Sequence, residues 1–268
     1  MLWRNALPLS AVVLAYCTYF DHRVVAPPFD GRKVLFIGPG MGHVAFTLGF
    51  VGTLLADEEL VDAIHAERAV FGGTSSGGMV ASYAAAVLAG CGTVDDWYRA
   101  LRKGYETVAN RSTLAMLQEL DAAARAHHGR CRVERPDWLR EYLGPLSVTE
   151  VGTLRPRFFT SFDGEDDFAA AMTASSYVPG LMGLRPWLRV RGAAAFDGYL
   201  SLWRTWLPQN YLYIGFLPTL PVHRIGEHSL RAFEYDSLPG WLSKANSRRP
   251  ISAQLGSSHL DLPAPLGS

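Results

Sequence analysis

The hydrophobic positions of this chain fall into short apolar runs, each followed by a glycine-rich turn and then by a longer segment with helical spacing of apolar residues. This order occurs twice in the first ninety or so residues. In chain order the segments are an apolar run at 33–37, a turn at 38–42, a helical segment at 43–60, a second run at 69–71, a second turn at 72–78 and an Ala-rich helical segment at 79–89. Repetition of strand, turn and helix predicts an α/β fold with a mostly parallel central sheet.

The pattern beyond residue 90 is less regular. Residues 94–143 are mostly helical in spacing, with one polar side. Further strands are expected at 157–162, 193–196 and 211–216, and a short helix at 168–175. We therefore expect one domain over residues 32–220, preceded by an apolar segment and linker at 1–31 and followed by a partly irregular extension at 221–268.

The start of the chain carries an apolar segment. Arg4 precedes the uncharged stretch 6–20, which Asp21 closes. About fifteen apolar residues suit the core of a signal peptide and fall short of the roughly twenty that span a bilayer. A helix packed on the domain and an anchor lying in the membrane interface are the alternatives. We expect membrane association, with entry into the secretory pathway left open.

Composition removes several classes of function. Twenty-five Lys and Arg balance twenty-five Asp and Glu, so the chain has no basic excess for binding nucleic acid. With 49% hydrophobic and only 19% charged residues, the chain is not disordered. No cysteine belongs to a CxxC pair, and the pair His127 and His128 lacks ligand partners at suitable spacing, so we expect no metal site and a surface position for this pair. Buried free thiols are favoured for Cys91 and Cys131, with a bridge between them left open.

The second glycine-rich turn contains a G-x-S-x-G motif with Ser75 at its centre, within Gly73–Gly77. A nucleophilic serine on a tight turn between strand and helix needs small neighbours, because the backbone on both sides comes into van der Waals contact. The turn also directs the hydroxyl at the positive end of the following helix. An apolar run precedes this motif and an Ala-rich helical segment follows it, which favours a nucleophile over a plain turn.

The first glycine-rich turn suits a second requirement of acyl transfer, an oxyanion hole. Backbone N–H groups at the start of a helix can hold the negative charge that develops on a carbonyl oxygen. The candidates are Gly38, Gly40, Met41 and Gly42, whereas Pro39 has no N–H. A dinucleotide-binding turn is disfavoured, because position 43 is His and no acidic residue ends the next strand. We expect no cofactor.

These motifs resemble the patatin-like phospholipases, including the triglyceride-lipase branch. The resemblance rests on the two glycine turns, on Asp197-Gly198 and on the segment Thr173-Ala-Ser-Ser-Tyr-Val-Pro-Gly180, which is similar to the family's A-S-x-x-x-P. It covers about residues 32–220 and implies a three-layer α/β/α fold with a Ser–Asp dyad. The first turn lacks the family's basic residue, and Tyr199 stands where the family has Gly or Ala.

The resemblance implies a lipid acyl hydrolase in which Asp197 takes the proton of Ser75 and an acyl-enzyme forms, with a lipid ester as substrate and a membrane or lipid-droplet surface as partner. Desolvation by the flanking apolar residues would raise the basicity of this carboxylate. Two alternatives remain open. One is an α/β-hydrolase triad of Ser75, Asp197 and either His223 or His228, and the other is a catalytically silent, membrane-docking member of the family.

Aromatic residues gather just beyond Asp197, at Trp203, Trp206 and Tyr211, together with Leu207. Because Trp and Tyr favour bilayer interfaces, these residues suit a lipid-facing mouth of the site. Packing in the core explains them equally well.

Overall fold

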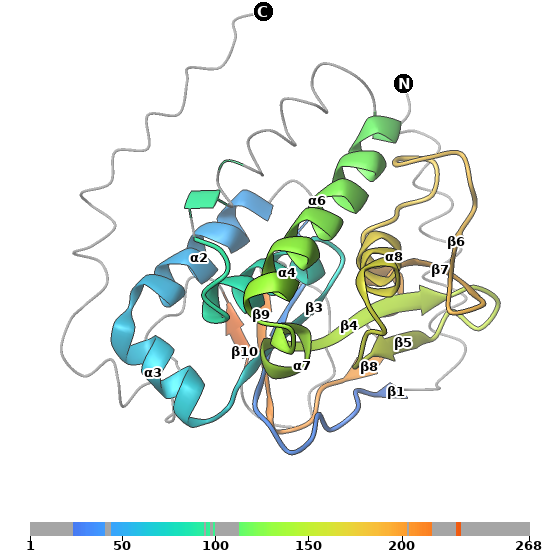
Figure 1. Ribbon diagram of the computed structural model, residues 1–268. Helices are drawn as coiled ribbons and strands as arrows, with labels where there is room; N and C mark the ends of the chain where they lie inside the picture. The colour runs from blue at the N-terminus through green and yellow to red at the C-terminus, as the bar shows by residue number, and fades with distance from the viewer. Residues whose placement is uncertain are drawn as a thin grey trace, which may run out of the picture.

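The computed structural model describes residues 24–40, 44–93, 95, 96, 99, 113–202, 204–215 and 229–231. Its centre is an eight-stranded sheet in the order β10-β9-β2-β3-β4-β7-β6, with β5 pairing the remaining edge of β4 (Figure 1). The strands are β2 (Val34–Ile37), β3 (Val70–Thr74), β4 (Leu143–Glu150), β5 (Pro156–Phe159), β6 (Leu188–Val190), β7 (Ala193–Asp197), β9 (Tyr211–Gly215) and β10 (Ser229–Arg231).

The sheet is parallel from β10 to β4 and antiparallel beyond it. Strands β10, β9, β2, β3 and β4 run in the same direction, whereas β5 and β7 pair antiparallel with β4, and β6 antiparallel with β7. The predicted α/β class with a mostly parallel central sheet is therefore confirmed. Strand β10 comes from the expected C-terminal extension, so part of that segment completes the sheet.

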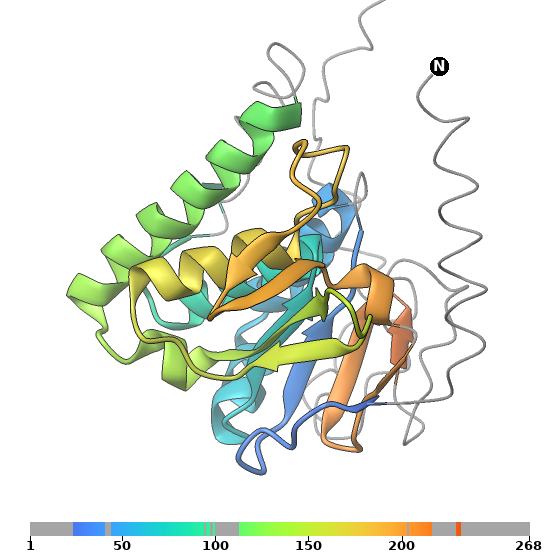
Figure 2. The same cartoon turned by 90° about the vertical axis from the view of Figure 1, so that its right-hand side faces the viewer.

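The long helices lie on one face of the sheet, which Figure 2 shows nearly edge-on. They are α2 (Val44–Ala56), α3 (Glu58–Ala66), α4 (Ser76–Leu88), α6 (Thr113–Glu134) and α8 (Glu165–Ser175), and the five-residue helix α7 (Trp138–Tyr142) packs with them. Alternate strand residues such as Leu35, Phe71 and Ile214 point into this helical side and form one buried cluster with it. In the part of the chain that the structure describes, no helix is long and apolar enough to cross a membrane.

The opposite face of the sheet is covered by shorter segments. Phe36, Tyr211 and Tyr213 point to this side and pack against Phe29 and Leu207 in a second buried cluster. The covering segments are β1 (Val24–Val25), β8 (Thr205–Trp206), which pair in parallel, and the four-residue helix α9 (Tyr199–Leu202). The long helices of the described residues thus occupy one face, and residues 24–31, expected as a linker, belong to the packed domain.

The strand expected at 157–162 is β5 (Pro156–Phe159), and the helix expected at 168–175 is α8, which begins at Glu165. Two other differences from the sequence expectation have local reasons. The single helical segment expected at 43–60 is two helices, because the Asp57 side chain accepts a hydrogen bond from the Leu60 N–H at 3.2 Å and so begins α3. Strand β3 extends through the second glycine-rich turn as far as Thr74. The turn itself is therefore confined to the one residue between β3 and α4.

Candidate active site

Ser75 forms the sharp turn between β3 and α4. Its backbone has φ 56° and ψ −135°, a conformation that residues with a side chain rarely adopt. Such a conformation costs about 1–3 kcal/mol and persists where the surrounding structure enforces it. The strand before it and the helix that begins at Ser76 fix both ends of this turn. This is the geometry that the G-x-S-x-G motif predicts for a nucleophile.

The glycines of the motif allow three backbone segments to touch. A Cβ on Gly77 would lie 2.3 Å from the carbonyl oxygens of Ile37 and Gly38, and one on Gly73 would lie 2.6 Å from the Gly77 carbonyl. Any side chain at either position would push the helix away from the ends of β2 and β3. The small residues are therefore required by close backbone contact, as the sequence analysis predicts.

Asp197, at the end of β7, accepts a hydrogen bond from the Ser75 hydroxyl. The distance from Ser75 Oγ to Asp197 Oδ2 is 2.7 Å, and the second carboxylate oxygen accepts the Tyr199 N–H at 2.8 Å. Sheet register places the two residues together, because Thr74 pairs with Ser147 on β4 and the next β4 residue pairs with Asp197. The predicted juxtaposition across 122 positions of sequence is present.

Burial makes this carboxylate more basic than an ordinary one. Asp197 is 2% exposed, and loss of solvent raises the pKa of its carboxyl from 3.8 to about 7. The hydrogen bonds from the Tyr199 N–H and the Ser75 hydroxyl act in the opposite direction, and the effect of burial exceeds them. A base of this strength can accept a proton near neutral pH.

A third side chain, Ser175 at the end of α8, fixes the backbone of the nucleophile. Its hydroxyl accepts the Ser75 N–H at 3.0 Å and donates to the Ser147 carbonyl at 2.7 Å, and its own carbonyl accepts the Gly198 N–H. The Asp197 N–H in turn donates to the Tyr177 carbonyl at 2.8 Å. The segment at 173–180 therefore connects both members of the pair, a role that the sequence analysis did not assign to Ser175.

The glycine after the aspartate is also required by contact. A Cβ on Gly198 would lie 2.1 Å from Thr74 Oγ1 and 2.3 Å from the Ser147 carbonyl oxygen. Both atoms belong to the strands that flank Ser75. The chain can turn away after Asp197 only because position 198 has no side chain.

The expected oxyanion donors need a correction. The Gly38 N–H donates to the Ile214 carbonyl at 2.7 Å as part of the sheet, and the Gly40 N–H donates to Ser76 Oγ at 2.8 Å. Both groups are thus engaged within the fold, because the turn continues the β2 ladder and then contacts the start of α4. Met41 and Gly42 lie outside the described residues.

The start of α4 supplies N–H groups that the sequence analysis did not name. Ser76 and Gly77 are the first two residues of this helix, where the N–H groups have no intrahelical acceptor. In the described part of the chain neither N–H has another acceptor. These groups carry the positive end of the helix dipole and follow the serine directly, which suits them to hold a developing oxyanion.

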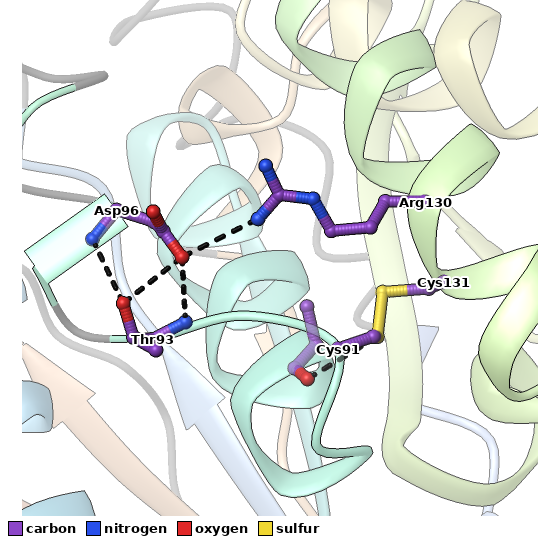
Figure 3. The surroundings of a disulfide bond; sticks show 6 residues. Cys91, Thr93, Asp96, Arg130 and Cys131 are labelled. Carbon is purple, nitrogen blue, oxygen red and sulfur yellow. Dashed lines mark hydrogen bonds and ion pairs between the residues drawn. A yellow bond between two sulfur atoms is a disulfide. The ribbon is translucent and has the colours of Figure 1, made fainter.

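The favoured interpretation of the cysteines is wrong. Cys91, just after α4, and Cys131, on α6, form a disulfide bond with a Cα–Cα distance of 5.1 Å (Figure 3). Beside it, the Asp96 carboxylate accepts hydrogen bonds from Thr93 and pairs with Arg130 at 3.3 Å. Two cysteines forty residues apart in sequence meet because α6 packs across the end of α4, which local sequence does not reveal.

The surface position expected for the histidine pair is also wrong for His128. This side chain is 4% exposed and its ring lies near those of Trp138 and Phe168, with centroids 6.5 and 6.1 Å away. Burial lowers the pKa of His128, which favours the neutral ring. Its environment is aromatic, and the described residues contain no cluster of His, Cys, Asp and Glu suited to a metal ion.

Of the residues expected at a lipid-facing mouth beyond Asp197, the structure places two in the core and leaves the lipid contact a prediction. Leu207 and Tyr211 are buried in the second cluster and so belong to the core, while Trp206 is half-buried. Trp203 lies outside the residues whose side chains are described. His223 and His228, the alternative triad members, also lie outside the described residues.

Comparison with protein-family models and with curated proteins finds no match to this chain.

Proposed function

We propose that this chain is a serine hydrolase of the patatin-like kind, which cleaves lipid carboxylic esters through the Ser75–Asp197 dyad. The observation that carries the proposal is the 2.7 Å hydrogen bond from a strained Ser75 to a buried carboxylate with a pKa of about 7. A serine in such a conformation and a carboxylate of such basicity both cost stability, and each suits a step of acyl transfer.

The chemistry proceeds in two halves. In the first, Asp197 takes the proton of Ser75 as Oγ attacks the ester carbonyl carbon, and the N–H groups of Ser76 and Gly77 stabilise the oxyanion. The tetrahedral intermediate collapses, the bond to the alcohol breaks, and protonated Asp197 gives its proton to the leaving oxygen. In the second, Asp197 takes a proton from water, the hydroxide attacks the acyl-enzyme, and the proton returns to Ser75 as the acid leaves.

This scheme needs no cofactor and no metal, since the chain supplies nucleophile, base and oxyanion donors. Position 197 also explains the absence of a histidine from the proposed mechanism. Asp197 contacts the hydroxyl directly, so an imidazole between the two has no space in this arrangement.

A second candidate, a catalytically silent docking protein of the same fold, draws on one observation. Ser75 exposes only 5% of its surface. That protein would keep the sharp turn at Ser75 and the Ser75–Asp197 pair as structural features without admitting a substrate. The two candidates differ in whether an electrophile reaches Ser75 Oγ.

Labelling with a fluorophosphonate tests the proposal, because this probe needs a reachable and activated serine. We expect the full chain to be labelled, Ser75→Ala to be unlabelled and the neighbouring Ser76→Ala to keep its label. Hydrolysis of a short p-nitrophenyl ester should follow the same order. Absence of labelling in the oxidised, folded protein would support the silent candidate.

The triad alternative is separated by a further pair of variants. The dyad predicts that His223→Ala and His228→Ala keep both labelling and ester turnover. Loss of turnover in either variant, with folding intact, would replace the dyad by a Ser-Asp-His triad.

A further inference from the structure

Exposed apolar side chains gather in one short segment, the loop of residues 178–187 between α8 and β6. In the described part of the chain five large hydrophobic side chains are exposed, and three of them lie in this loop. They are Leu184 at 100%, Leu181 at 43% and Trp187 at 42% exposure. A concentrated exposed apolar patch on a soluble fold marks a surface that meets a membrane or another protein.

The loop is held in this exposed form by its own hydrogen bonds. The Met182 N–H donates to the Val178 carbonyl at 3.0 Å and the Gly180 N–H to the Gly183 carbonyl at 2.9 Å. Met182 is buried, while its neighbour Leu181 points outward. The Tyr177 hydroxyl donates to the Arg185 carbonyl at 2.6 Å and ties the second half of the loop down. Leu184 lies between these hydrogen-bonded residues and is fully exposed.

The loop begins at the dyad itself. The residue at its base, Tyr177, accepts the Asp197 N–H through its carbonyl, and Ser175 two positions earlier holds the Ser75 N–H. Figures 1 and 2 show the segment as the gold trace that projects beyond the end of α8. The base of this loop is therefore held directly by the two residues of the candidate dyad.

Charge identifies the kind of surface. Residues 168–196 contain three arginines and no acidic residue. Arg191 pairs with Asp167 at 2.9 Å, whereas Arg185 and Arg189 are exposed and form no ion pair in the described part of the chain. Leu and Trp flanked by arginine suit a bilayer interface, where the apolar side chains enter the acyl boundary and the guanidinium groups meet anionic head groups.

We propose that the 178–187 loop is a membrane-docking element that inserts Leu181, Leu184 and Trp187 into a bilayer containing anionic phospholipid. The choice of a lipid surface rests on the proposed function, since a loop attached to a lipid-cleaving dyad would bring that dyad to its substrate. The insertion is a property of the folded loop and does not depend on the chemistry at Ser75.

The test separates docking from catalysis by measuring vesicle binding in a Ser75→Ala background. Sucrose-loaded vesicles of phosphatidylcholine, alone or mixed with phosphatidylglycerol, are sedimented with the full oxidised chain. We expect Leu184→Gln with Trp187→Gln to weaken binding by about tenfold to a hundredfold, because each inserted side chain contributes its transfer free energy. The matched control is Val133→Gln, which changes another strongly exposed apolar side chain, on α6 (84% exposed), and should leave binding unchanged. Replacing Arg185 with Gln should reduce the preference for phosphatidylglycerol by about fivefold.

A second readout locates the insertion even where another segment of the chain also binds vesicles. A Leu184→Cys variant in a Cys17→Ser background carries an NBD fluorophore at position 184. Its emission should rise and shift to the blue on vesicles, whereas the same label at Val133→Cys should not respond. Where Trp187→Gln impairs folding, Leu184→Gln alone replaces the double variant.

Several outcomes would overturn docking by this loop. Unchanged vesicle binding in the double variant is one, and an unresponsive label at position 184 is another. With Ser75 restored, loss of hydrolysis of a soluble short-chain ester in the Leu184→Gln, Trp187→Gln variant would show that the loop supports the dyad and does not dock to a membrane. A change in oligomeric state of the free protein would assign it to a contact with a second copy. Failure of the proposed function has a different signature, since the chain with Ser75 intact would then show no fluorophosphonate labelling and no ester hydrolysis that Ser75→Ala removes, whatever the vesicles show.

Discussion

Replacing Asp197 with Asn should abolish ester hydrolysis and at the same time make the protein more stable at neutral pH. Asn keeps the size of the side chain, its carbonyl oxygen can still accept the Tyr199 N–H, and its amide can donate to Ser75 Oγ. What disappears is a buried group that must ionise. General base catalysis typically contributes about 10²–10⁴-fold, so the rate should fall by at least that range.

The size and sign of the stability change follow from proton linkage. The folded state holds its proton up to a pKa of about 7, and the unfolded chain releases it near 3.8. Between these values the folded state binds more protons, so stability falls by about 1.4 kcal/mol per pH unit as pH rises, and the stabilisation by the neutral carboxyl is lost above about 7. Over the whole range between the unfolded and folded pKa values, the free energy of unfolding therefore falls by about 4 kcal/mol. The amide of the Asp197→Asn variant does not titrate and escapes this loss.

Urea unfolding of both proteins from about pH 4 to pH 8.5 measures the effect. The advantage of Asp197→Asn should be near zero at the acid end, should grow through pH 5 and 6, and should level off above about pH 7. Turnover of the unmodified chain should rise with pH over the same region, because the base must be deprotonated.

The matched control is Asp167→Asn, which should behave with the opposite sign. Its ion pair with Arg191 lowers the pKa of Asp167, so the carboxylate contributes stability at neutral pH that is lost as pH falls through its pKa. Asp167→Asn should therefore destabilise at neutral pH. If Asp197→Asn also destabilises at pH 8, or if its effect does not vary with pH, the carboxylate is not a desolvated base and the mechanism fails.

Three further predictions concern the structure around the dyad. Reduction of the Cys91–Cys131 bond, or replacement of both cysteines by Ser, should lower the free energy of unfolding by about 4 kcal/mol, because the bond closes a loop with a sequence separation of 40. Urea denaturation measures this change, and Cys17→Ser is the control that should leave stability unaffected. Gly198→Ala should reduce stability by about 1–3 kcal/mol or more and impair labelling of Ser75, because its Cβ would collide with Thr74 and Ser147; an unchanged melting temperature would contradict the described contact. Ser175→Ala should lower the free energy of unfolding by about 1–3 kcal/mol, because the buried Ser75 N–H loses its acceptor, and it should also lower kcat. The midpoint of the pH profile should stay unchanged, because Asp197 keeps its surroundings. A wild-type kcat would contradict a positioning role for Ser175.

Local sequence is sufficient to predict the turn at Ser75 and the strand and helix on either side of it. Three segments have a local pattern of apolar residues that predicts a strand or a helix without knowledge of its neighbours. They are the runs at 33–37 and 69–71 and the Ala-rich segment after Ser75, and the structure has β2, β3 and α4 there. The glycines of the motif were informative for the same reason, since their requirement comes from atoms a few residues away and from the adjacent strand.

Strand β4 is not among the expected strands, and its Gly144 and Pro145 are typical of a break in a strand. The structure shows why a strand tolerates them. The pairing between β3 and β4 shifts register between Phe71 and Gly73, and a Cβ on Gly72 would lie 2.7 Å from the Pro145 carbonyl oxygen. Proline is accepted at such an irregularity, where no ladder hydrogen bond is lost. The partner strand supplies this information, which the local sequence lacks.

The features that sequence could not provide depend on which segments pack together. The N–H groups of Gly38 and Gly40 are hydrogen-bonded to Ile214 and Ser76. The role of Ser175 depends on the end of α8 lying next to the turn at Ser75. The disulfide depends on α6 crossing α4. These partners lie many residues away, and no periodicity in one segment reports on them.

The cross-link between α4 and α6 also bears on where and how this protein matures. Helix α4 starts next to Ser75, and Cys91 lies just beyond its other end, so oxidation of one thiol pair holds the helix whose first N–H groups directly follow the candidate nucleophile in the chain. Bonds of this kind form and persist in the endoplasmic reticulum, the periplasm or outside the cell, and are rare where glutathione keeps thiols reduced. We therefore expect the chain to acquire its final rigidity only in an oxidising environment, and a recombinant host with such a compartment to yield the chain with this bond formed.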